Sequence, residues 1–284
     1  MPELPEVEHA RRQLERWAAG ATLTGSRVAD RAVVRAGLSS RPSDAVADPE
    51  AALAPLVGRV AGVPERHGKR LGWPFGDRVL LGHLGMSGKW VRRAPSDPAP
   101  VAGRLGLELR RGGEDLVCWL VDTRRFGCVS VGMDPDLHAG LGPDCATNPL
   151  DGPELAARFQ VRRPVKVALL DQDRIAGLGN IHAAEALWRA GIHPDRACAG
   201  LTAAEWARLA AAIRVQIAGA LADMDGQDEV TYLSEGGDDS AFSVYGRHGE
   251  PCPRCGGMVV REVRAQRGTW WCPTCQPDPG RAGT

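Results

Sequence analysis

The first apolar residues of the chain recur at helical spacing. Val7, Ala10, Leu14 and Trp17 are three or four positions apart, so in a helix they share one face. Pro5 suits the first turn of such a helix, because the N–H that proline lacks has no partner there. We therefore predict a helix of about four turns that begins almost at the first residue.

Shorter apolar runs follow the predicted helix, separated by glycine, proline and aspartate. Residues 78–84 and 116–121 are examples of these runs, and their composition is typical of strands. Residues 95–103 contain three prolines and are predicted to form a loop. The first segment of the chain is thus expected to fold as a β-sandwich or barrel-like sheet with a flanking helix.

The pattern becomes helical beyond a linker at 134–153 that is rich in Pro, Gly, Asp and Asn. Thr202, followed by Glu205, resembles a capping box. Gly177 and Gly179 interrupt the helical pattern, and the backbone N–H groups of such a turn suit a phosphate, although an ordinary helical hairpin has the same pattern. The predicted helices are 155–159, 165–170, 181–190 and 202–223.

Four cysteines near the C-terminus have the spacing of a zinc ribbon. Cys252, Cys255, Cys272 and Cys275 form a C-x2-C-x16-C-x2-C cluster, which can converge on one tetrahedral Zn²⁺. With all four positions held by sulfur the metal would be structural. Two disulfides in a secreted tail are the alternative, and we expect no signal peptide that would favour it. The other cysteines have no metal or redox spacing and are interpreted as buried or incidental thiols: Cys118, Cys128, Cys145 and Cys198.

The net charge hides a segregation of basic and acidic residues. The 284 residues carry 35 basic and 35 acidic side chains, a balance that by itself argues against a nucleic-acid partner. Residues 158–174 hold five Arg or Lys against two Asp, and residues 223–239 hold seven acidic residues and no base. Such a surface can offer a cationic groove to a phosphate backbone. The sequence also predicts a basic face on the ribbon, formed by Arg254, Arg261, Arg264 and Arg267.

The start of the chain, Met1-Pro2-Glu3-Leu4-Pro5-Glu6, can supply a nucleophile. Removal of Met1 would leave Pro2 as a secondary amine, and an N-terminal amine is about one tenth unprotonated at pH 7. Its attack on a carbonyl-like carbon gives a cationic iminium, with the Glu3 and Glu6 carboxyls close enough in sequence to move protons. The same residues suit the first turn of a helix, so on local grounds the structural role is favoured.

Five motifs along the chain belong together. They are Pro2-Glu3-Leu4-Pro5-Glu6-Val7-Glu8, His83-Leu84-Gly85-Met86-Ser87-Gly88, Arg124-Arg125-Phe126-Gly127, Gly177-Leu178-Gly179-Asn180-Ile181, and the cysteine ribbon with Gln266-Arg267. In type and order they resemble the motifs of the formamidopyrimidine-DNA glycosylase and endonuclease VIII family. The resemblance extends from residue 2 to residue 276, and five motifs in order are far more specific than any one alone.

The resemblance implies an α+β multidomain enzyme of base excision repair. The implied parts are an N-terminal catalytic β-sandwich with flanking helices (1–140), a helix-two-turns-helix domain (141–244) and a zinc ribbon (245–276). The composition of the Pro- and Gly-rich tail (277–284) predicts disorder. The enzyme would be a bifunctional glycosylase and lyase that excises an oxidised base and nicks the strand by β,δ-elimination. Its implied partner is damaged double-stranded DNA, and its cofactor is one structural Zn²⁺. We expect a monomer in a bacterial-type cytoplasm, associated with the nucleoid through DNA and without a membrane segment.

The resemblance also implies a catalytic role for four residues. Pro2 would attack C1′ of the damaged nucleotide, Glu3 would act as general acid at the sugar, and Glu6 would support that site. Lys69 would contact the phosphate and the lesion. Read locally, Lys69 would be an ordinary solvated lysine at the end of a strand.

Further residues are implied in DNA binding. A flipped nucleotide leaves a gap in the duplex, which Met86, Arg124 and Phe126 would fill. Read locally, Met86 and Phe126 would more often be core residues, but both stand beside glycine in apparent turns. The phosphates around the lesion would be contacted by Lys166, Asn180 and Arg267.

Three positions depart from the family's pattern. His182 stands where the family usually has tyrosine, which could make a contact near the phosphates sensitive to pH. The acidic segment 223–239 lacks the glycine-threonine signature of the 8-oxoguanine branch, and we expect it to face away from DNA. Residues 141–145 keep part of the pattern, with an expected effect on the hinge. The lesion stays open among 8-oxoguanine, formamidopyrimidines, oxidised pyrimidines and abasic sites.

Two other functions account for part of the sequence. A non-catalytic binder of abasic or distorted DNA would keep the phosphate contacts and the zinc, and retention of Met1 would favour it, since an acylated proline is no nucleophile. A zinc-ribbon RNA-binding or transcription factor would leave Pro2 and the gap-filling residues unexplained. The breadth of the resemblance favours the enzyme.

Overall fold

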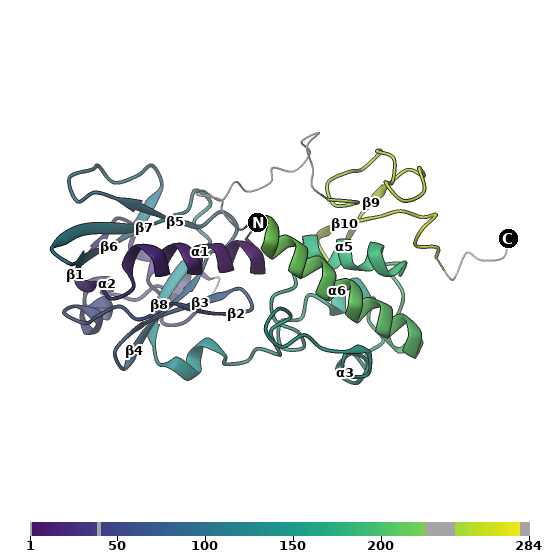
Figure 1. The fold of residues 1–284 in the computed structure, drawn as a ribbon, viewed down its shortest axis with the longest axis horizontal. Helices are drawn as coiled ribbons and strands as arrows, with labels where there is room; N and C mark the ends of the chain where they lie inside the picture. The colour runs from purple at the N-terminus through teal and green to yellow at the C-terminus, as the bar shows by residue number, and fades with distance from the viewer. Residues whose placement is uncertain (1, 39–40, 225–241, 279–284) are drawn as a thin grey trace. The chain divides into compact units, whose positions relative to one another are not determined.

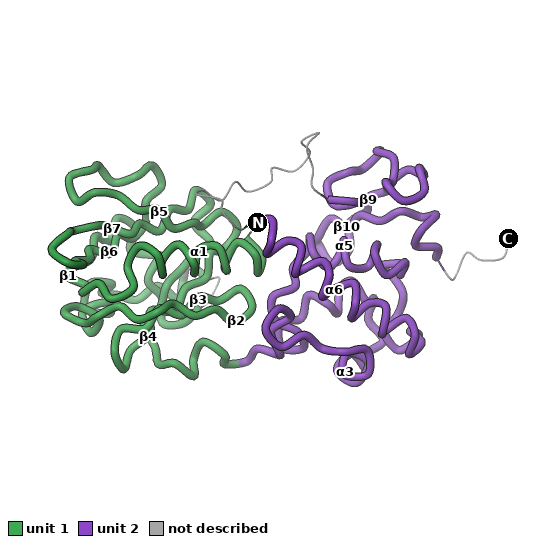
Figure 2. The backbone as a smooth tube through the Cα atoms, viewed as in Figure 1, with its two compact units in different colours: residues 1–139, 224–232 green, residues 140–223, 233–284 purple. Residues whose placement is uncertain are grey.

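The computed structural model describes residues 2–38, 41–224 and 242–278. The chain divides into two units, of which unit 1 holds residues 1–139 with 224–232 and unit 2 holds the rest (Figure 2). Most of the acidic segment and of the expected disordered tail lies outside the described residues. No helix within these ranges combines the length and the apolar character that crossing a bilayer requires.

Unit 1 begins with the predicted helix, α1 (Leu4–Ala18). Pro5 lies in its first turn, and the predicted apolar face is buried at Val7, Ala10 and Leu14. Trp17 packs against the same core while remaining partly exposed. The prediction of an early amphipathic helix is therefore confirmed.

Two antiparallel sheets of four strands form the body of unit 1 (Figure 1). One has the strand order β1-β6-β7-β5 and the other β2-β3-β4-β8. Both sheets and α1 contribute side chains to the same buried cluster, for example Trp73 and Leu107, which is the predicted sandwich. The elements are β1 (Thr22–Val28), α2 (Pro49–Leu53), β2 (Glu65–His67), β3 (Arg70–Phe75), β4 (Arg78–His83), β5 (Lys89–Arg93), β6 (Gly103–Arg111), β7 (Glu114–Val121) and β8 (Cys128–Gly132), with 3₁₀ turns at Arg31–Val33, Pro42–Asp44, Ala54–Leu56 and Asp134–Leu137.

Strand β7 is apolar on both faces. Its even-numbered residues from Leu116 to Leu120 join the sandwich core. The odd-numbered residues from Val117 to Val121 form a second cluster, because successive side chains of a strand point to opposite sides. This explains why the run at 116–121 shows no alternation of polar and apolar residues in the sequence.

Four α-helices precede the ribbon in the described part of unit 2, close to their predicted bounds. They are α3 (Gly152–Arg158), α4 (Val165–Ala168), α5 (Asn180–Ala190) and α6 (Ala203–Asp223), with a 3₁₀ turn at Cys198–Gly200. Helix α6 packs against α3 and α5 (Figure 1). The predicted capping box is present, since Glu205 N–H donates to Thr202 Oγ1 at 3.3 Å and Thr202 N–H donates to Glu205 Oε2 at 2.8 Å.

Gln172 organises the turns between α4 and α5. Its Nε2 donates to Leu178 O at 2.8 Å, and its Oε1 accepts from Gly177 N–H at 3.0 Å. Gly177 has a φ of 105°, a conformation that residues with a side chain rarely adopt. The predicted interruption by glycine is therefore confirmed, and α5 starts only at Asn180.

The ribbon is a hairpin of β9 (Val260–Arg264) and β10 (Arg267–Trp271). Its core includes Trp188 of α5 together with Val259 and Trp270, so the hairpin and the helix are packed together. The four cysteines outside the ribbon are all buried, which agrees with their interpretation as buried thiols.

Candidate nucleic-acid interface and zinc centre

The four ribbon cysteines are arranged for one metal ion. Their Sγ atoms all lie within 4.8 Å of one another, with Cys252 Sγ 3.9 Å from Cys275 Sγ and Cys255 Sγ 3.4 Å from Cys272 Sγ. Tetrahedral Zn²⁺ with Zn–S bonds of about 2.3 Å places its sulfurs about 3.8 Å apart. The set therefore fits one structural zinc ion, with all four coordination positions taken by the protein.

The C-terminal end of α5 holds the first metal knuckle. Trp188 Nε1 donates to Cys252 Sγ at 3.3 Å, a contact of the kind that orients a metal ligand. The Arg254 guanidinium lies 4.2 Å from the centre of the Trp188 ring and donates to Trp188 O at 2.9 Å. A cation at this end of a helix is also favoured by the helix dipole. Metal binding and the position of α5 are thus coupled by direct contacts.

The opposite end of α5 carries the predicted phosphate contacts. Lys166 Nζ donates to Asn180 Oδ1 at 2.5 Å, and Asn180 Nδ2 donates to Gly268 O at 2.9 Å. Gly268 adjoins Arg267 in β10, so the structure brings together all three residues that the sequence predicts to contact phosphates. Asn180 is the first residue of α5, where backbone N–H groups without helical partners suit an anion.

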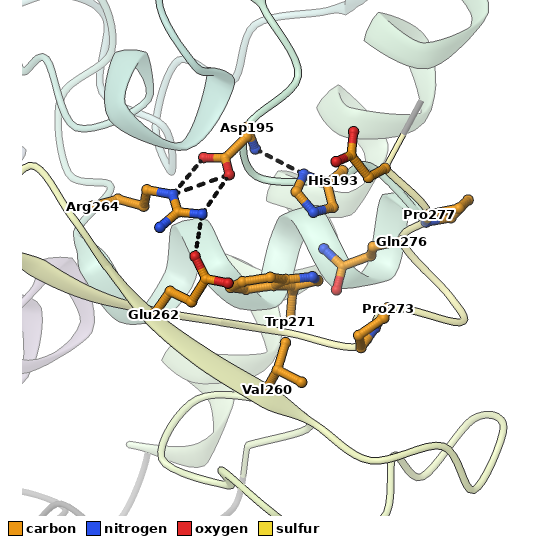
Figure 3. A pocket seen from close by; sticks show the side chains of 10 residues that line it. His193, Asp195, Val260, Glu262, Arg264, Trp271, Pro273, Gln276 and Pro277 are labelled. Carbon is orange, nitrogen blue, oxygen red and sulfur yellow. Dashed lines mark hydrogen bonds and ion pairs between the residues drawn. The ribbon is translucent and has the colours of Figure 1, made fainter. Parts of the chain in front are cut away.

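The prediction of a basic ribbon face is wrong in part. Arg261 and Arg264 lie on opposite faces of the hairpin, because they are three positions apart in one strand. The charge of Arg264 is neutralised by two carboxylates, since its Nη2 lies 2.9 Å from Asp195 Oδ2 and also pairs with Glu262 (Figure 3). These three residues line a pocket of about 540 Å³. Arg267 is exposed and has no ion pair within the described residues, which leaves it suited to a phosphate.

The predicted catalytic residues at the chain start lie at the beginning of α1. Pro2 and Glu3 are buried, and Glu3 is the residue that precedes the helix. Glu3 N–H donates to Glu6 Oε2 at 2.8 Å. Glu6 therefore satisfies a backbone donor that would otherwise lack a helical partner, and this fixes the backbone beside Pro2.

Lys69 lies in a tight hairpin turn between β2 and β3, where His67 pairs with Arg70. Gly68 has a φ of 57°, as the first central residue of such a turn requires. The hairpin is tied to α1 because Arg66 Nε lies 3.2 Å from Glu8 Oε2. Lys69 is partly buried, and its charge contributes to the lowered pKa of His83 at the end of β4.

The three predicted gap-filling residues are carried by two neighbouring loops of unit 1. Met86 is partly buried, Arg124 is exposed, and 42% of Phe126 is exposed. The Arg124 guanidinium lies 5.7 Å from the centre of the Phe126 ring. A position in the hydrophobic core is therefore excluded for Phe126, and the two loops together present a side-chain cluster suited to insertion between bases.

His83 supports the loop that carries Met86. Its Nδ1 accepts from Gly85 N–H at 3.0 Å, which requires that nitrogen to be unprotonated. Burial, together with the charges of Lys69, Arg70 and Arg35, lowers the pKa of His83 to about 4. The ring is therefore neutral at physiological pH.

This lowered pKa predicts a loss of stability in mild acid. The unfolded chain protonates His83 near its ordinary pKa of 6.5, whereas the folded protein resists protonation down to about 4, so stability falls as the pH drops through that window. At pH 5 the loss is about 2 kcal/mol relative to pH 7. In His83→Asn, whose amide oxygen can still accept from Gly85, this part of the loss should disappear. The free energy of unfolding in urea, determined at pH 7 and pH 5, measures this difference. His248→Asn, which replaces an exposed histidine, is the control. Equal loss of stability in His83→Asn and the unsubstituted protein would contradict the lowered pKa of His83.

His182, which departs from the family's pattern, is buried. It is 3% exposed, and its Nδ1 lies 3.3 Å from Gln216 Nε2 of α6. It therefore joins α5 to α6, and its predicted pH-sensitive contact near the phosphates stays a prediction.

Sequence reasoning missed two buried carboxylates. Glu185 accepts the backbone N–H groups of Ser243, Val244 and Tyr245, each at 2.9 Å. Asp122 accepts backbone N–H groups in the loop that carries Arg124 and Phe126. Each of the two lies at the end of or within an apolar run, and this position could have indicated burial. A buried carboxylate needs hydrogen-bond donors, so a role in holding backbone N–H groups could have been predicted.

Family models match most of the chain. A model described as formamidopyrimidine-DNA glycosylase N-terminal domain matches residues 1–129, and one described as formamidopyrimidine-DNA glycosylase H2TH domain matches residues 141–230. A third, a zinc finger found in FPG and IleRS, matches residues 249–277.

Curated proteins and solved structures are similar over nearly the full length. Formamidopyrimidine-DNA glycosylase from Acidothermus cellulolyticus is 38% identical, with 99% of each chain covered. The protein of that name from Halorhodospira halophila is 40% identical, with 97% of this chain and 100% of the relative covered. A structure of MutM in complex with DNA containing carbocyclic 8-oxo-G, and one of Lactococcus lactis Fpg with DNA containing an abasic site, each give a TM-score of 0.82 at 28% identity and cover 98% of this chain and 100% of theirs.

Proposed function

The chain belongs to the formamidopyrimidine-DNA glycosylase family, and on this premise we propose that Pro2 is the nucleophile with which it excises a damaged base. The protein is a DNA glycosylase of base excision repair that binds damaged DNA and one structural zinc ion. The chemistry at Pro2, the roles of the other site residues and the class of base are the proposal. The observation that carries it is the placement of Pro2 and a buried Glu3 at the start of α1.

The proposed reaction forms a covalent intermediate. The lone pair of the Pro2 nitrogen attacks C1′ of the nucleotide, the glycosidic bond breaks, and the base leaves with a proton. Glu3 protonates the sugar ring oxygen as general acid, which opens the ring to an iminium. Loss of the C2′ proton then expels the 3′ phosphate, and a second elimination expels the 5′ phosphate. The positive end of the α1 dipole disfavours protonation of the amine and so keeps it reactive.

The remaining residues act around this centre. Lys69 contacts a phosphate and the lesion. Met86, Arg124 and Phe126 fill the gap that the flipped nucleotide leaves. Glu6 supports the site through its contact with the Glu3 backbone. Names and titles of the relatives favour oxidised purines, namely formamidopyrimidines and 8-oxoguanine, as the bases removed.

Borohydride reduction tests the central step. During reaction with abasic duplex DNA, the iminium should be reduced to a stable amine that joins the DNA to the N-terminal peptide. Mass spectrometry of the digested complex locates the bond. Attachment at Lys69 would reassign the nucleophile, and absence of a complex would contradict covalent catalysis.

Lys166, Asn180 and Arg267 are proposed to bind the phosphates on both sides of the lesion. Arg267→Ala should weaken duplex binding to the same degree for every sequence and lower the slope of log K against log salt by about one. Fluorescence anisotropy titrations at several salt concentrations measure this. Arg214→Ala, an exposed arginine of α6 in the same unit and outside the basic segment 158–174, is the control. A loss confined to particular sequences would contradict a phosphate role.

The organisation and location of the protein complete the proposal. We propose catalytic, helix-two-turns-helix and ribbon domains at 1–140, 141–244 and 245–276, acting as a monomer. The named relatives are bacterial and chromosomal DNA is the substrate, which supports action in the cytoplasm.

A further inference from the structure

The buried carboxylate of Asp122 closes the loop that carries Arg124 and Phe126. Asp122 is 1% exposed. Its Oδ2 accepts from Gly127 N–H at 2.6 Å, and its Oδ1 accepts from Arg124 N–H at 3.2 Å. One side chain thus binds the backbone at two points of the turn, from the side opposite to solvent.

Ser87 joins the second loop to the same carboxylate. Its Oγ donates to Asp122 Oδ1 and accepts from Arg124 N–H at 3.1 Å. The two loops are also in direct backbone contact, because a Cβ added at Gly85 would lie 2.4 Å from Gly127 N. Gly85 has a φ of 64°, so both its conformation and its surroundings require glycine.

Arg104 compensates the buried charge. Its side chain is 3% exposed, and its Nη1 lies 3.7 Å from Asp122 Oδ2 and donates to Gly127 O at 3.1 Å. Its Nε donates to Asp30 Oδ2 at 2.8 Å. A buried carboxylate paired in this way holds its partners firmly, because loss of one partner leaves the other without compensation.

We infer that Asp122 is a positioning residue, which holds the loops of Met86, Arg124 and Phe126 as one preformed wedge. The inference rests on the proposed gap-filling role of these three side chains. A wedge ordered before DNA binds does not lose conformational freedom when it enters the base stack. Asp122 is buried, and within the described residues its side chain makes its polar contacts with the loop backbone, Ser87 and Arg104, so its effect on the reaction is through the loops.

The test compares two abasic duplexes, one intact and one with a one-nucleotide gap opposite the abasic site. The gapped duplex has no orphaned base, so the wedge is not needed there. The amide of Asp122→Asn has one acceptor oxygen and one donor nitrogen in place of two acceptor oxygens. It therefore cannot accept hydrogen bonds both from the Gly127 N–H and from the Arg124 N–H with Ser87. Its rate of borohydride trapping should fall about 10- to 100-fold on the intact duplex and much less on the gapped one. Ser87→Ala should show the same selectivity with a smaller loss.

Two controls separate the possible failures. Asp115→Asn alters an exposed carboxylate of β7, the strand that precedes Asp122, and should trap both duplexes at the unsubstituted rate. An equal loss on both duplexes in Asp122→Asn, or no loss on either, would overturn the inference. Failure of the unsubstituted protein to be trapped on either duplex would instead contradict the proposed function of Pro2. A 2-aminopurine next to the lesion should report slower insertion of the wedge in Asp122→Asn, a smaller delay in Ser87→Ala, and no delay in Asp115→Asn.

Discussion

A protein in which one glutamine is inserted between Met1 and Pro2 should form almost no covalent complex with abasic duplex DNA. The insertion leaves Pro2 in place but acylates its nitrogen, so the lone pair is delocalised into an amide. We expect trapping and nicking to fall at least 100-fold, equivalent to about 2.7 kcal/mol of activation free energy. The measurement is the rate of borohydride trapping, with duplex affinity determined in parallel to show that binding persists.

Pro2→Ala is the matched variant for this experiment. It keeps a free amine, but the imine of a primary amine must be protonated to become the electron sink that the iminium of proline is from the start. Its trapping rate should therefore lie between those of the unsubstituted and the blocked protein. Full activity of the blocked protein would refute Pro2 as nucleophile, and Lys69 would be the next residue to replace.

Removal of zinc should abolish duplex binding while unit 1 stays folded. The ribbon has a small core, formed with Trp188, and a module of this size depends on the metal for its stability. Because the ribbon also holds the C-terminal end of α5, the phosphate contacts at Asn180 and Arg267 should be lost together. Chelation followed by limited proteolysis should release the ribbon and leave unit 1 resistant, and added Zn²⁺ should restore binding.

Cys255→Ser provides a genetic version of zinc removal. Cys255 is exposed, so without a metal its replacement would change stability by no more than about 0.5 kcal/mol. As a zinc ligand it should cost several times that amount and lower duplex affinity. Thr274→Ser, an exposed change in the opposite knuckle, is the control. Normal zinc content and binding in Cys255→Ser would contradict the metal site.

Local patterns predicted the elements of the fold well. The spacing of apolar residues gives α1, the glycines give the break before α5, and the cysteine spacing gives the ribbon, because each depends on residues close together in the chain. Helix α4 is shorter than predicted, since the chain turns at Leu169 and Leu170, where apolar residues continue the helical pattern beyond the helix itself.

Contacts between distant residues were not predictable in this way. Arg264 is paired with Asp195, which lies 69 positions earlier, so the sequence indicated a basic residue where the structure has a neutralised one. Ser87 and Asp122 meet only because β5 and β7 are neighbours in one sheet. The roles of Pro2 and Lys69 came from the family resemblance, since locally both suit ordinary structural positions.

Helix α5 has its metal-linked residue Trp188 and its phosphate-linked residue Asn180 at opposite ends of one continuous segment. Each residue added to or removed from a helix rotates everything beyond it by about 100°. A single insertion or deletion between these two positions would turn one end away from its partner while leaving the composition almost unchanged. In related sequences this stretch should therefore vary in side chains but keep a fixed length.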